Sequence, residues 1–209
     1  MPSQLRFRPH ALPLSIRLHY EPTSRALRGE VQLRSTKSPD VVQIQSDIRL
    51  GPPLKTDLFR YKAQSVWTHS ENPVLIDYLE ENLNRATSRQ WGGQKIQDFL
   101  DPLSFCFSFF GEEALQPEPL HTQLLVRAQK LVAVNLRLEA IEERVFSFLG
   151  NQTRRQLVYA AEVPDLPAAQ TFQPRLWIDK QLRIPTSLEA KVPMFGTVAI
   201  RLVDFHQEA

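Results

Sequence analysis

The chain has 209 residues, of which 42% are hydrophobic, 9% aromatic and 23% charged, and its formal net charge is +2. This composition supplies one sizeable core and excludes a disordered chain. The single cysteine, Cys106, excludes an intrachain disulfide and a cysteine-based metal cluster.

The N-terminal sequence and the apolar runs bear on the compartment. Residues 1–6 contain no apolar segment of the kind found in signal peptides. The apolar runs are also far shorter than the roughly 20 residues that a spanning helix needs. We therefore expect a soluble, cytoplasmic protein with no membrane span.

Four segments near the N-terminus alternate between apolar and polar residues. They cover residues 14–20, 27–34, 42–50 and 59–67, and the links between them are rich in proline, serine and aspartate. A period of two with short polar links predicts an antiparallel meander with one solvated face.

The solvated face of this meander carries basic residues. Residues 1–68 hold 11 Lys/Arg and five Asp/Glu, whereas residues 69–113 hold three and eight. The basic face could attract a nucleic-acid backbone or an acidic partner. Alternatively, it could simply pair with the acidic segment of the same chain. The candidate residues are Arg17, Arg28, Arg34, Arg60 and Lys62.

The next segment reads as a short helical pair followed by a strand. Asn72 as an N-cap and Pro73 in the first turn predict a helix over residues 72–86, and residues 94–100 predict a second, shorter helix. Apolar residues alternate with polar ones over residues 103–109, which predicts a buried strand.

Residues 120–150 carry the longest apolar pattern in the chain. One series recurs every seven residues and a second is offset from it by three, so the pattern predicts a long amphipathic helix. The helix could pack on a sheet within the domain or pair between two subunits. A third interpretation is a strand, because residues 132–139 also alternate. The candidate interface helix comprises Leu124, Leu131, Val134, Leu138, Ile141, Val145 and Phe148.

Three further strands are predicted after Gly150, over residues 155–161, 176–184 and 196–205. The order of elements predicts one α+β domain over residues 1–209, with a possible weak subdivision near residue 150. Its mostly antiparallel sheet would comprise the N-terminal four-strand meander plus the C-terminal strands. This sheet would pack on the long amphipathic helix and the shorter helical pair.

Motifs for chemistry are missing from the sequence. The glycines do not form a phosphate-binding loop, and the five histidines do not have metal-ligand spacing. Cys106 lies in an apolar run, which predicts an inert thiol. His69 near Glu71 is the one place where a carboxylate could orient a base. We expect no catalytic residues, no cofactor and no metal.

These observations favour a non-enzymatic structural, assembly or adaptor protein. It would act through protein–protein contacts or self-association, as a subunit of a larger complex. A nucleic-acid-binding protein using the basic sheet face is the first alternative. The second is an enzyme whose site assembles from scattered residues around His69.

Overall fold

A computed structural model describes residues 3–23, 27–52, 58–92, 99–110, 119–126, 129–164, 173–192 and 196–208. Strands make up most of this part of the chain, together with one short α-helix, α1 (Pro102–Phe107). Two short 3-10 helices are η1 (Pro9–Ala11) and η2 (Ser147–Leu149). The strands are β1 (Ser3–Gln4), β2 (Ser15–Pro22), β3 (Arg28–Lys37), β4 (Val41–Gly51), β5 (Phe59–Thr68), β6 (Leu75–Asn82), β7 (Thr87–Gly92), β8 (Phe99–Leu100), β9 (Leu120–Val126), β10 (Lys130–Phe146), β11 (Gln152–Glu162), β12 (Arg175–Asp179), β13 (Pro185–Val192) and β14 (Gly196–Glu208).

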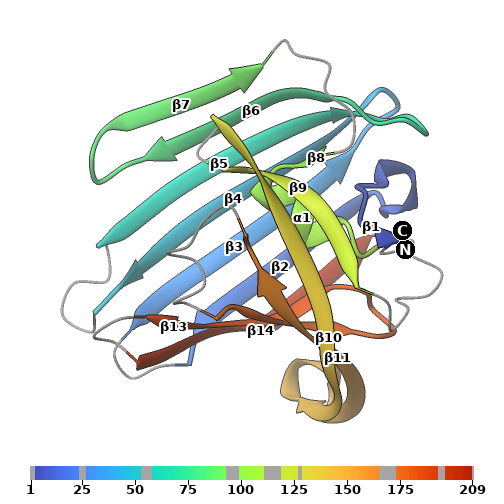
Figure 1. Cartoon of the computed structure of the whole chain (residues 1–209), viewed down its shortest axis with the longest axis vertical. Coiled ribbons are helices and arrows are strands. Elements are labelled where there is room, and N and C mark those ends of the chain that lie inside the picture. Colours follow the sequence, from blue (N-terminus) through green and yellow to red (C-terminus); the bar gives the residue numbers. More distant parts are fainter. Residues whose placement is uncertain are drawn as a thin grey trace.

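All these strands belong to one curled sheet. Its order is β1-β9-β10-β11-β12-β13-β14-β2-β3-β4-β5-β6-β7, and β8 pairs with β9 beside this path. The pairs along the path are antiparallel except that β1 adds to β9 in parallel. In Figure 1, β9 and β10 cross in front of β3, β4 and β5, which gives the molecule a barrel-like shape.

The concave side of the sheet holds the hydrophobic core. Alternate residues of β2 to β4, such as Ile16, Leu33 and Ile44, are buried there. The helix α1 contacts β4, β5 and β9, and its Phe107 is fully buried. Trp67 lies among aromatic rings, with its centroid 5.2 Å from that of Phe7. The helix therefore fills the space that the curled sheet encloses.

The predicted meander is confirmed as strands β2 to β5. Each predicted segment lies on one of these strands, and consecutive strands pair antiparallel. Most polar residues of these strands face away from the core, as period-two patterning predicts, whereas Ser35, Ser46 and Ser65 are buried on the core side.

The predicted α+β class is wrong, because the long amphipathic helix does not exist. The described residues of this segment form β9 over 120–126, β10 over 130–146 and η2 over 147–149. Seven is an odd number, so residues seven apart in a strand lie on opposite faces, whereas in a helix they share one face. In β10, however, the bulge between Leu138 and Ala140 cancels this change of face, so Ile141, which pairs with the core residue Leu157, stays on the face of Val134. Val134 is 4% exposed because the core covers this face of the first half of β10, and Ile141 is 60% exposed because it lies on the extension beyond. The strand interpretation of residues 132–139 is the correct one.

The helix and the strand predicted over residues 72–109 are also wrong. Residues 75–92 form the β6–β7 hairpin, and residues 102–107 form α1 instead of a strand. The helix starts at a capping box in which the Asp101 carboxylate accepts from the Leu103 and Ser104 amides at 2.7 and 3.1 Å. The helix is apolar on several sides because it packs within the core. Its apolar residues therefore alternate with small residues as they would in a buried strand. Most of the predicted helix 94–100 lies outside the described residues, and its end forms β8.

The C-terminal strands agree with the sequence except at one place. The strands β11, β12 and β14 lie on the three predicted segments, but β13 was missed. Prolines at positions 185 and 193 conceal it. Pro185 is the first residue of the strand, a position that tolerates the missing N–H.

Candidate binding site at the β10–β11 arm

The second half of β10, η2 and the first half of β11 form an extension that we call the arm (residues 140–158). The strand β10 pairs with β9 only up to Leu136, and the register with β11 shifts between Leu138 and Ala140. Beyond this shift the arm runs to η2, which contacts β14 (Figure 1). The chain turns back at Gly150, whose φ of 67° suits glycine in this left-handed conformation.

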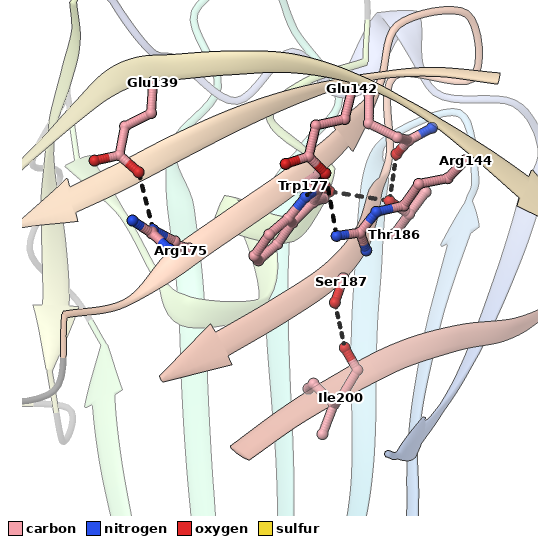
Figure 2. Close-up of polar contacts among 9 residues, drawn as sticks. Glu139, Glu142, Arg144, Arg175, Trp177, Thr186, Ser187 and Ile200 are labelled. Carbon is pink, nitrogen blue, oxygen red and sulfur yellow. Dashed lines mark hydrogen bonds and ion pairs between the residues drawn. The ribbon is translucent and has the colours of Figure 1, made fainter. Parts of the chain in front are cut away.

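Trp177 on β12 connects the arm to the sheet. Trp177 lies on the face of β12 opposite the core residue Leu176 and is 4% exposed. Its indole N–H donates to Oε2 of Glu142 at 3.0 Å, and Arg144 donates to the same carboxylate at 3.3 Å. The Arg144 guanidinium also lies 4.5 Å from the centre of the indole ring (Figure 2), a cation–π contact.

Further polar contacts connect the strands beneath the arm. The side chain of Gln156 is buried, and its Nε2 donates to the Asp179 carboxylate at 2.9 Å. The Thr186 hydroxyl donates to Oε1 of the same Gln156 side chain. The Thr186 hydroxyl also contacts the carbonyl of Trp177 at 3.3 Å (Figure 2). The polar groups of this network satisfy one another, so the network is suited to holding the arm in place rather than to catalysis.

The opposite face of the arm is solvated and partly apolar. Ile141 and Val145 are 60% and 62% exposed, more than the other large exposed hydrophobic side chains of the described chain. Glu143 lies between them on the strand and faces Arg155 of β11, with 3.7 Å between the carboxylate and the guanidinium Nε. This face therefore combines two apolar side chains with one charge of each sign.

A groove lies between the tip of the arm and the end of the barrel. It has a volume of about 490 Å³. Phe146 and Phe148 line it from the arm, Glu21 from β2, and Arg201 and Val203 from β14.

The structure separates the seven residues of the predicted interface helix. Leu124 lies on β9 and Phe148 on η2, while the other five lie on β10. Val134 is buried, whereas Ile141 and Val145 share the solvated face of the arm. Glu142, Arg144 and Trp177, which hold this face in position, were missed because their contacts join strands far apart in sequence.

The five predicted basic residues do share the outer face of β2 to β5. Arg17 lies directly opposite Arg34 on the neighbouring strand. Carboxylates lie between the basic groups: Asp47 pairs with Arg49 at 3.1 Å, and Glu30 lies 3.3 Å from the ring of His19. The face is therefore mixed in charge. The complete predicted set comprises Arg17, Arg28, Arg34, Arg60 and Lys62.

The other candidate groups do not assemble into a reactive site. The His69 ring contacts the carbonyl oxygen of Pro39 at 3.2 Å, and Glu71 lines a separate groove of about 250 Å³. Burial, reinforced by the charge of Asp101, raises the pKa of the Cys106 thiol to about 12. Within the described ranges no three metal-ligating side chains form a cluster. No helix in this same part of the chain is long and apolar enough to cross a membrane.

Comparison with known proteins places the chain by its fold. No protein-family model and no curated protein matches it. The crystal structure of a β-barrel-like protein of a domain of unknown function, DUF1849, from Brucella abortus aligns with 95% of this chain and 99% of that chain, with a TM-score of 0.52 and 11% sequence identity. The likeness is one of fold alone. It shows a β-barrel-like fold in place of the expected α+β class. A candidate lipoprotein from Parabacteroides distasonis aligns with 94% of this chain and 98% of that chain, with a TM-score of 0.37 and 6% identity.

Proposed function

We propose that the protein is a non-enzymatic assembly protein that associates with a second copy of itself through the solvated face of the arm. The observation that carries this proposal is the exposure of Ile141 and Val145, which lie on one face of the arm on either side of Glu143. Exposed apolar groups with a polar surround mark protein contact sites. Because the Trp177 network fastens the other face, the surface is ordered before a partner binds.

The charges on this face support a copy of the same chain as the partner. Glu143 and Arg155 are each about two-thirds exposed and flank the two apolar side chains. In a two-fold interface, when one residue contacts a second residue of the other copy, the reciprocal contact is also made. The Glu143 of each copy would then approach the Arg155 of the other, so the face is complementary to itself.

The test is the absolute mass in solution by light scattering, at concentrations up to about 100 μM, where weak association becomes visible. We expect a dimer that Ile141→Asp and Val145→Asp convert to a monomer. Leu14→Asp, an equally exposed site outside the arm, is the matched control and leaves the dimer intact. A monomeric wild-type protein over the whole range overturns the proposal.

A charge exchange tests the contact more sharply. Glu143→Arg and Arg155→Glu should each weaken the dimer, because like charges would then meet across the two-fold axis. The double variant restores the charge pairs and should dimerise. Failure of the double variant to recover, with its fold intact by circular dichroism, contradicts this arrangement of the two copies.

Nucleic-acid binding is the second candidate function. It is favoured by Arg17 and Arg34, which lie opposite each other and form no ion pair with a described carboxylate. A phosphate would relieve the repulsion between two such neighbours. Affinity for a duplex should fall steeply with salt and be lost in Arg17→Glu/Arg34→Glu. Absence of binding at low salt excludes this candidate.

A cytoplasmic location is part of the proposal. Cell fractionation with antibody detection tests it, and recovery of the protein outside the cytoplasmic fraction contradicts it.

A further inference from the structure

The groove beside the tip of the arm has the dimensions of a ligand site. Its volume of about 490 Å³ lies within the roughly 300–1,000 Å³ usual for small-molecule pockets. Its walls come from distant parts of the chain: the arm tip, the end of β2 and the middle of β14. The Trp177 network holds one wall in place, because it fixes Arg144 next to the groove (Figure 2).

One wall of the groove is apolar. The rings of Phe146 and Phe148 lie edge to face with centroids 5.4 Å apart. Val203, which is 36% exposed, and Val145 also line the groove. Phe146 and Phe148 are half-buried, and Phe148 also packs against the core, so the wall offers the part of this apolar surface that remains accessible.

The opposite wall offers a cation. Arg201 lies on β14 with Glu21 and Ser187 as its cross-strand neighbours. It forms no ion pair with any carboxylate of the described chain. Arg144, by contrast, is already paired with Glu142. Arg201 is therefore the group available to an anionic ligand.

Glu21 limits the negative charge that a ligand in this groove can carry. The Glu21 carboxylate lines the same groove, so the titratable lining comprises two arginines and one glutamate. A dianion such as a phosphate monoester would meet repulsion from Glu21. A monoanion can pair with Arg201 with less such cost.

We propose that this groove binds an amphipathic carboxylate, with the carboxylate paired to Arg201 and the apolar chain or ring lying against Phe146 and Phe148. The site lies at the tip of the arm, whereas the proposed dimer contact centres on Ile141. The two proposals share Val145, but Ile141 belongs only to the dimer contact and Arg201 only to the groove, so variants of these two residues let the proposals fail separately.

The experiment is calorimetric titration of the full chain with decanoate below its micelle concentration. Decanol, acetate and decyl phosphate serve as comparison probes. We expect saturable binding of decanoate that is at least tenfold tighter than that of decanol or decyl phosphate, and no binding of acetate, because both the charge and the apolar part are needed.

Variants assign the binding to this groove. Arg201→Gln should weaken decanoate binding about tenfold and abolish the preference over decanol. Phe148→Ser should weaken both probes. Arg34→Gln, a matched change on the outer face of β3, should alter neither. Ile141→Asp should retain decanoate binding even where it abolishes dimerisation. Absence of saturable decanoate binding, equal affinity for decanoate and decanol, or unchanged binding in Arg201→Gln overturns the proposal.

Discussion

Two tryptophans make the same hydrogen bond in different surroundings. Trp67 donates to Asp101 at 2.9 Å, and this carboxylate is fully buried. Trp177 donates to Glu142 at 3.0 Å, and this carboxylate is 43% exposed, so water can replace the lost donor. The surroundings, rather than the bond length, should therefore decide what each bond contributes to stability.

Replacing each tryptophan with phenylalanine tests this expectation. Trp67→Phe should lower the free energy of unfolding by about 3 kcal/mol, because it removes packed volume and a donor to a buried charge. Trp177→Phe should lower it by about 1 kcal/mol. Urea unfolding measures both. Equal losses would contradict the role assigned to burial.

Asp101 should also make stability depend on pH. Burial raises the pKa of this carboxyl, against the opposing effect of hydrogen bonds from Ser104, Leu103 and Trp67. Since the folded-state pKa lies above the unfolded value of about 3.9, the contribution is complete below pH 4 and is lost as the pH rises through the folded pKa.

The variant Asp101→Asn removes this titration and keeps an oxygen for the helix cap. The stability of the wild type relative to this variant should fall as the pH rises above about 4. Urea unfolding at a series of pH values measures the difference. A difference that is constant, or that grows with pH, contradicts the expected direction.

At the scale of elements, the alternation of apolar and polar residues correctly predicted β2 to β5. In the middle of the chain the apolar pattern predicted the wrong elements. The meander strands expose one face to water, so polarity alternates as expected. In β10 the bulge keeps the apolar residues of both halves on one face, but the core covers this face only in the first half, and the arm exposes Ile141 and Val145 in the second. The helix α1 is surrounded by core, so its sequence lacks a polar stripe.

Two residues of the predicted helical stripe distinguish strand from helix directly. Val134 and Ile141 would share the buried face of a helix, but in β10 Val134 is 4% exposed against the core and Ile141 is 60% exposed on the arm. Val134→Asp should cost about 4 kcal/mol because it buries an unpaired charge. Ile141→Asp should change stability by no more than about 0.5 kcal/mol. Similar costs, measured by thermal unfolding, would contradict the strand.

At the scale of the whole molecule, the decisive contact is the pairing of β14 with β2. It joins residues 15–22 to residues 200–208 and makes one sheet of the two halves of the chain. No local pattern marks such a pairing, because its partners are separated by nearly the whole sequence. The groove next to Arg201 depends on the same pairing, which is why the sequence contained no sign of it.

Shortening the chain tests this pairing. Removal of residues 202–209 takes away the buried Leu202 and most of the partner of β2, so we expect no cooperative unfolding transition. Removal of residues 207–209 takes away only exposed side chains of the described strand and should leave the transition in place. Circular dichroism during heating separates the two outcomes, and a cooperative transition in the shorter chain contradicts the expectation.

The same pairing determines when the sheet can close during synthesis on the ribosome, because β2 cannot pair with β14 until β14 has been made. β14 is synthesised about 180 residues after β2. At 5–20 residues per second, β2 waits roughly 10–40 s for its neighbour. Throughout that interval one edge of the nascent meander has no partner strand. The sheet is therefore expected to close only after β14 has been synthesised. Until then the unpaired edge of β2 is where a chaperone would act or where two unfinished chains would join.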